Sequence, residues 1–91
     1  MNTPAFDVVV FGATSFVGRI LCRYLLAQAG RGELRWAAAG RSLAKLEQLR
    51  SELGPKAAQL SLVVADAANE RSLHEMVTKA RVIVSTVGPY A

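Results

Sequence analysis

Little in this sequence could cross-link the chain or anchor it in a membrane. Cys22 is the single cysteine among 91 residues, so no disulfide can form within the chain, which fits a reducing compartment. The stretches without a charged residue, Val82–Ala91 among them, are too short to span a bilayer. No Lys or Arg precedes the short apolar run near the amino terminus, as it would in a secretory signal. We therefore expect a cytoplasmic protein without a membrane-spanning segment.

The sequence also lacks a run of like charges. Its 11 Lys and Arg residues outnumber 7 Asp and Glu residues, but no block of five like charges occurs. Basic tails that bind nucleic acid depend on such blocks, so we expect no nucleic-acid partner. The net charge of +4 is a mild excess that suits a small anionic ligand.

Clusters typical of metal centres and hydrolytic triads are missing as well. His74 has no cysteine, histidine or paired carboxylate at ligand spacing, so no metal site is expected. No Ser-His-Asp arrangement can be argued, and we assign no catalytic residue. What remains is a globular composition, 52% hydrophobic and 20% charged, in a chain long enough for one modest core.

The apolar pattern alternates between short runs and helical spacing. Strands are expected over Phe6–Phe11, Leu34–Ala39, Gln59–Ala65 and Arg81–Val87. Helices are expected over Ser15–Ala29, over Leu43–Leu53 capped by Ser42, and over Glu70–Lys79 capped by Asn69. The apolar face of the first helix is expected to comprise Val17, Ile20, Leu21, Tyr24 and Leu25.

Strands and helices in strict alternation predict a Rossmann-like α/β fold. Such chains form a parallel sheet with right-handed crossovers and helices on both faces. The doubly wound order places the four strands as 3-2-1-4, with three helices between them. Ligands bind where that order reverses, between the first and fourth strands.

The segment after the first strand has the glycine spacing of a phosphate-binding turn. It reads GATSFVG, with Gly12 closing the strand and Gly18 six residues later, in the first turn of the expected helix. Glycines here permit a tight turn and close packing of the helix, whose first N–H groups attract a pyrophosphate. Ser15 stands where the looser G-x-x-G-x-x-G pattern has its middle glycine, and its hydroxyl can donate to a phosphate oxygen. The alternative is a plain turn between a strand and a helix.

The second strand ends in Gly40-Arg41-Ser42, where the adenosine ribose of a dinucleotide is expected, about 20 residues past the glycine loop. An acidic residue there would hold the ribose 2′-hydroxyl, whereas Arg41 favours the 2′-phosphate of NADP. NAD remains possible. Ser42 can add its hydroxyl and backbone N–H. The alternative is an exposed arginine beside a residue that only caps the next helix.

Two further segments follow strands on the same edge of the sheet. Asp66 and Ala67 come after the third strand and are candidates for a wall beside the adenine, with entry into the next helix as the equal alternative. Gly88, after the fourth strand, would let the backbone approach the cofactor, and Pro89 ends the strand.

Together these motifs resemble the N-terminal region of the saccharopine dehydrogenase-like oxidoreductases, a group that includes trans-acting enoyl reductases. The resemblance rests on VVVFGATSFVGRILCRYLL, AAAGRSLAKLEQL, VVADAANERSLHEMV and VIVSTVGPY. It implies an NAD(P)-binding Rossmann domain. It places Gly12, Thr14, Ser15, Phe16, Val17 and Gly18 at the pyrophosphate, Arg41 and Ser42 at the 2′-phosphate, Asp66 and Ala67 at the adenine, and Val87, Gly88 and Pro89 toward the nicotinamide.

The same resemblance implies that residues 1–91 are the N-terminal part of the dinucleotide-binding domain, without the catalytic and substrate domain. We therefore expect the cofactor-binding portion of an NADP-dependent oxidoreductase. The alternatives are a non-enzymatic NADP sensor of NmrA-like type and a structural fragment without ligand affinity. The fourth strand is apolar and uncharged at its end, so it is also expected to pair with another copy of the chain as an exposed edge.

Overall fold

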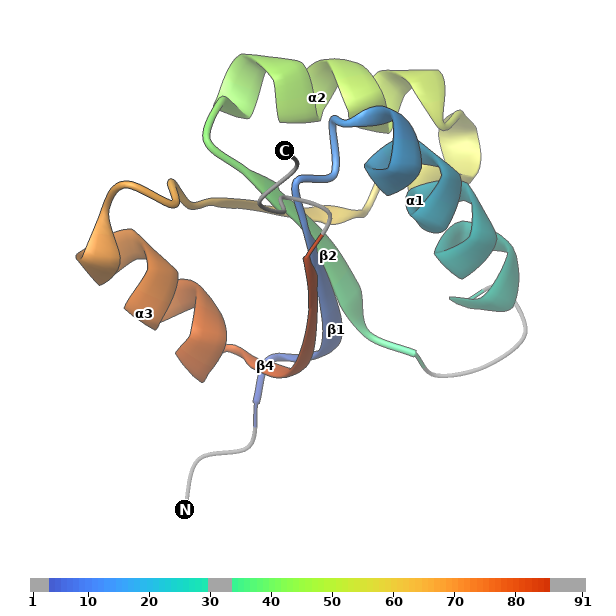
Figure 1. The fold of residues 1–91 in the computed structure, drawn as a ribbon. Helices are drawn as coiled ribbons and strands as arrows, with labels where there is room; N and C mark the ends of the chain where they lie inside the picture. Colours follow the sequence, from blue (N-terminus) through green and yellow to red (C-terminus); the bar gives the residue numbers. More distant parts are fainter. Residues whose placement is uncertain (1–3, 30–33, 86–91) are drawn as a thin grey trace.

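A computed structural model describes residues 4–29 and 34–85 of the chain (Figure 1). The strands are β1 (Phe6–Phe11), β2 (Trp36–Gly40), β3 (Ser61–Val64) and β4 (Ala80–Ser85). The helices are α1 (Phe16–Ala29), α2 (Leu43–Glu52), the short 3₁₀ helix η1 (Pro55–Ala57) and α3 (Glu70–Thr78). The expected alternation of strands and helices is confirmed, with η1 as an addition after Gly54.

The strands form one parallel sheet in the order β3-β2-β1-β4, which confirms the predicted order. At the carboxyl end of the sheet, Phe11 of β1 lies between Ala39 of β2 and Ser85 of β4. The order reverses at β1, since β2 pairs on one side of it and β4 on the other. The loop that follows β1 therefore starts at the position where doubly wound folds bind ligands.

Helices cover both faces of the sheet, with α1 and α2 on one face and α3 on the other (Figure 1). On the first face, Cys22 of α1 and Leu46 and Leu49 of α2 pack with Trp36 in one buried cluster. On the second face, Met76 of α3 packs against Val9 and other strand residues. All five residues of β2 are buried, as expected for a strand in the middle of a sheet that is covered on both sides.

The two predicted helix caps are confirmed. The Ser42 hydroxyl oxygen accepts a hydrogen bond from the Lys45 backbone N–H at 3.3 Å, and the Asn69 side-chain oxygen accepts one from the Ser72 N–H at 3.0 Å. Each bond satisfies one N–H group that the first turn of a helix leaves without a partner. These caps fix where α2 and α3 begin, immediately after the ends of β2 and β3.

The predicted apolar face of α1 is wrong in part. Val17, Ile20 and Tyr24 are each at least half exposed, whereas Gly18 and Cys22 are buried. The reason is that Gly18 brings the helix backbone against the loop before it, which turns the Gly18–Cys22 side of α1 toward the sheet. Of the predicted face, Leu21 and Leu25 pack against the core as partly buried residues.

None of the helices within residues 4–29 and 34–85 combines the length and the apolar character needed to cross a bilayer. In the same residues, no three His, Cys, Asp or Glu side chains are grouped so that they could hold a metal ion.

Candidate functional site

The glycine loop begins with a turn that only glycine adopts easily. Gly12 has a φ of +83°, in the left-handed region where other residues are strained. The N–H groups of Gly12 and Ala13 donate to the carbonyl oxygen of Ala39 at 3.0 and 3.1 Å, and the Ser15 N–H donates to the Gly12 carbonyl at 3.0 Å. These bonds fasten the loop to the carboxyl end of β2 and fold it back toward the start of α1.

Gly18 allows α1 to touch this loop. A Cβ atom at residue 18 would lie 2.3 Å from the Gly12 carbonyl oxygen and 2.8 Å from two backbone atoms of Ala13. No side chain fits there, because real Cβ atoms essentially never come within 3.0 Å of such atoms. Gly18 therefore serves the close packing of helix and loop that the sequence pattern predicted for it.

Ser15 caps the first helix. Its hydroxyl oxygen accepts a hydrogen bond from the Gly18 N–H at 3.0 Å, which is the N-cap arrangement, and its carbonyl accepts the Arg19 N–H at 2.9 Å. A hydroxyl that accepts one bond can still donate another. The middle residue of the motif thus orders the helix start, and donation from its hydroxyl to a phosphate stays a prediction.

Three N–H groups of the loop are left over for an anion. Within the described part of the chain, the N–H groups of Thr14, Phe16 and Val17 have no hydrogen-bond acceptor. The Phe16 side chain is 80% exposed and Val17 is half exposed, so the loop faces solvent here. Free N–H donors at the positive end of a helix dipole are the chemistry that a pyrophosphate requires, so the residues present fit this part of a dinucleotide.

The segment after β2 lies beside this loop and is positively charged. Gly40 ends the strand next to Ala39, which holds the loop, and its carbonyl accepts the Ala65 N–H at 2.8 Å. Arg41 is exposed and makes no ion pair within the described residues. Lys45 lies in the first turn of α2, and this first turn contains no acidic residue. Ser42 has the capping role that was expected of it. The positive charges of Arg41 and Lys45 are therefore available to an anion at this end of the sheet.

Asp66 and Ala67 lie in the turn between β3 and α3. The Asp66 carboxylate accepts the Ala68 N–H at 2.9 Å, and the Asp66 N–H donates to the Ser72 hydroxyl oxygen at 2.9 Å. These bonds show the helix-entry role that was the alternative for Asp66. A place beside adenine stays a prediction. Val87, Gly88 and Pro89 lie outside the described residues.

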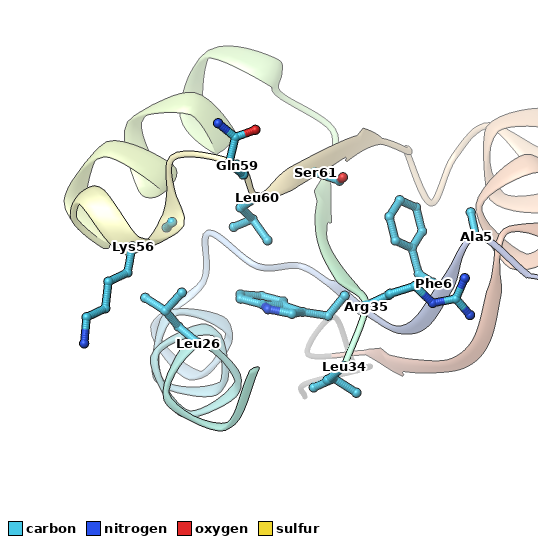
Figure 2. A pocket seen from close by; sticks show the side chains of 11 residues that line it. Ala5, Phe6, Leu26, Leu34, Arg35, Lys56, Gln59, Leu60 and Ser61 are labelled. Carbon is cyan, nitrogen blue, oxygen red and sulfur yellow. The ribbon is translucent and has the colours of Figure 1, made fainter. Parts of the chain in front are cut away.

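A cavity in the described part of the chain lies elsewhere (Figure 2). Its volume is about 630 Å³, and it is found at the amino ends of the strands, lined by Phe6, Trp36 and Ser61 together with Leu26 and η1. The glycine loop and Arg41 are at the opposite, carboxyl ends. Parallel α/β sheets bind ligands at the carboxyl ends, so the cavity is not the predicted site.

Asp7 and Cys22 have perturbed pKa values, and neither takes part in the candidate site. The Arg35 backbone N–H donates to the Asp7 carboxylate at 3.0 Å, and this bond lowers the pKa of Asp7 below 3.8. Burial raises the pKa of the Cys22 thiol to about 11, because the thiolate would lose its hydration inside the core. Cys22 is therefore a core residue.

The contacts that Arg19 makes with the glycine loop and with α2 were not predicted from the sequence. The Nε–H of Arg19 donates to the Thr14 carbonyl oxygen at 3.1 Å, and its terminal nitrogen forms an ion pair with Glu52 at the end of α2. Glu52 is 33 residues away in sequence, so no local spacing could have linked the two.

The fold, the strand-order reversal at β1 and the N–H donors of the loop define a dinucleotide-binding Rossmann domain. Residues 8–91 match the family model described as the saccharopine dehydrogenase NADP binding domain, and the chain belongs to this family. Its cofactor is accordingly NADP, which confirms the cofactor expected from the sequence.

Curated relatives carry the name of an enzyme. A trans-acting enoyl reductase of Mycobacterium ulcerans is 44% identical over 85 residues, and a putative trans-acting enoyl reductase of Mycobacterium tuberculosis is 45% identical over 85 residues. Each match covers 93% of this chain and 20% of the relative. The chain thus spans about one fifth of the length of these relatives.

Proposed function

We propose that this chain is the N-terminal part of the NADP-binding domain of an oxidoreductase, that Gly12–Gly18 hold the pyrophosphate of the cofactor, and that Arg41 holds its 2′-phosphate. One observation carries the proposal. Two groups lie together at the carboxyl ends of the neighbouring strands β1 and β2. They are the N–H groups of Thr14, Phe16 and Val17 in the loop, and the exposed side chain of Arg41. The loop would bind the pyrophosphate and Arg41 the 2′-phosphate.

The other residues of the site take supporting positions. Gly40, Ser42 and Lys45 surround the 2′-phosphate with backbone and positive charge, and Asp66 and Ala67 border the adenine. Val87, Gly88 and Pro89 are proposed to lie toward the nicotinamide. NADPH supplies a hydride when bound, and the relatives' name points to a substrate with an enoyl group, reduced with residues from another part of a longer protein.

The test compares NADPH with NADH, because the two differ only at the 2′-phosphate. Isothermal titration of the chain with each cofactor should give tighter binding of NADPH. Arg41→Ala removes a charge-assisted contact, for which about 1.5–3 kcal/mol is typical, so we expect NADPH affinity to fall by about 10- to 100-fold and NADH affinity to change little.

The matched control is Arg71→Ala, which removes the same charge from an exposed position on α3. Its NADPH affinity should stay close to that of the unmodified chain. Equal losses in both variants would reduce the role of Arg41 to net charge. Failure of both cofactors to bind the unmodified chain would refute the proposed function.

A further inference from the structure

Arg19 bonds to two separate parts of the structure. Its Nε–H donates to the carbonyl oxygen of Thr14 in the glycine loop at 3.1 Å. Its terminal nitrogen pairs with Glu52, the last residue of α2, whose second carboxylate oxygen accepts a bond from Gln48 at 3.4 Å. A single side chain thus connects the loop with the helix that begins at Ser42.

We propose that Arg19 is a positioning residue for NADP, which fixes the loop in the conformation that presents its N–H groups to the pyrophosphate. The inference rests on the proposed function, since it concerns the same site. Arg19 acts through the Thr14 carbonyl and need not touch the cofactor.

The peptide unit between Thr14 and Ser15 shows how this works. Its carbonyl oxygen is held by Arg19, and its N–H is held by the Gly12 carbonyl at 3.0 Å. Rotation of this peptide unit would break both bonds at once. It would also reorient a carbonyl dipole within a loop whose neighbouring N–H groups must face an anion. Holding the carbonyl therefore keeps the loop ready to bind, which lowers the ordering cost of binding.

The ion pair with Glu52 links the position of the loop to the proposed site of the 2′-phosphate. Helix α2 starts beside Arg41 and ends at Glu52, so the ion pair joins the loop to the element that carries the proposed 2′-phosphate site. The two side chains are 36% and 39% exposed, so the ion pair itself is partly screened by solvent. The bond to Thr14 is the contact that matters most for the loop.

Arginine is suited to this double role because its guanidinium presents several N–H donors in a fixed plane. The Nε–H and a terminal nitrogen bond to two acceptors from different elements at the same time. Lysine has the same charge but only a single ammonium group on a flexible stem. Arg19→Lys thus preserves charge near the loop and loses the planar fork.

The experiment measures NADPH affinity in Arg19→Gln, Arg19→Lys and a control, Arg23→Gln. Arg23 is exposed one turn further along α1, so the control removes the same charge from the same helix. We expect both Arg19 variants to bind NADPH about three- to tenfold more weakly, and the control to change by less than about twofold. Arg19→Lys with unmodified affinity would overturn the inference, because charge alone would then suffice.

Amide hydrogen exchange in the free chain tests the loop directly. The N–H groups of Ser15 and Gly18 are bonded within the loop, and their exchange should accelerate in Arg19→Gln but not in Arg23→Gln. Glu52→Gln removes the ion pair and leaves the Thr14 bond, so its affinity should fall less than that of Arg19→Gln. Equal effects of Glu52→Gln and Arg19→Gln on affinity and exchange would show that Arg19 only joins two helices, which overturns the positioning role.

The outcomes separate this inference from the proposed function. If the unmodified chain binds NADPH and the Arg19 variants match the Arg23→Gln control, only the positioning role is overturned. If the unmodified chain binds no NADPH, the proposed function fails and the inference fails with it.

Discussion

Replacing Gly18 with alanine tests the contact between α1 and the glycine loop. The added Cβ would lie 2.3 Å from the Gly12 carbonyl oxygen and 2.8 Å from two backbone atoms of Ala13. All three are backbone atoms, so no rotation of a side chain can relieve the overlap. Either α1 must move outward from the sheet, or the loop must leave its bonds to Ala39.

The expected cost can be worked out from two opposing effects. Forcing an extra carbon atom into a packed contact typically costs about 1–3 kcal/mol. Alanine in place of glycine within a helix gains up to about 1 kcal/mol, because glycine loses more backbone entropy on folding. Because all three overlaps are with backbone atoms, the upper part of that cost applies, about 2–3 kcal/mol, so we expect a net loss of about 1–2 kcal/mol in the free energy of unfolding. For a chain of this size each kcal/mol lowers the melting temperature by about 4–8 °C.

Thermal and urea unfolding, followed by far-ultraviolet circular dichroism, measure this loss. Gly40→Ala is the matched control, because its Cβ would meet the nearest atom, Leu46 Cδ2, at an ordinary 3.5 Å. The control should unfold within about 0.5 kcal/mol of the unmodified chain. A Gly18→Ala variant as stable as the unmodified chain, or more stable, would refute the packing described for this helix.

Three further predictions concern other parts of the molecule. The Cys22 thiol, fully buried with a pKa of about 11, should not react with a thiol reagent at neutral pH until denaturant is added; equally fast labelling of native and unfolded chains would contradict its place in the core. Asp7 has a lowered pKa, so its contribution to stability is present above pH 3.8 and is lost as the pH falls through its lower folded value; unfolding curves of Asp7→Asn should therefore depend less on acid pH than those of the unmodified chain, and identical pH profiles would rule this out. Finally, β4 pairs only with β1 among the described strands, and Val82 is 53% exposed, so we propose that two copies associate through this edge; sedimentation should show a dimer that Val82→Lys disrupts, and a monomer at high concentration would end the proposal.

The sequence predicted those features that depend on neighbouring residues. Ser42 and Asn69 cap helices because their side chains reach N–H groups three positions on, and alternation of strands and helices leads to the observed strand order. The spacing of Gly12 and Gly18 likewise located the turn and the close helix contact.

Features that depend on distant residues could not be predicted in this way. Helical spacing counts apolar residues but does not show that the backbone at Gly18 sets which side of α1 meets the sheet. The Arg19–Glu52 pair requires α1 and α2 to lie side by side on one face, which only the folded chain shows. Ser15 is a different case, because its bond to the Gly18 N–H spans only three residues and is a cap like those of Ser42 and Asn69. The sequence instead favoured a phosphate donor there, since Ser15 stands at the position of the middle glycine of the motif.

The position of Trp36 has a practical consequence for spectroscopy. It is the only tryptophan in the sequence, and it lies at the amino end of β2, beside the cavity in Figure 2 and away from the glycine loop. Its emission therefore reports whether the sheet and its helices are assembled. Because NADPH absorbs light in the range where tryptophan emits, folding is best followed through Trp36 in the absence of the reduced cofactor, and cofactor titrations through the emission of NADPH itself.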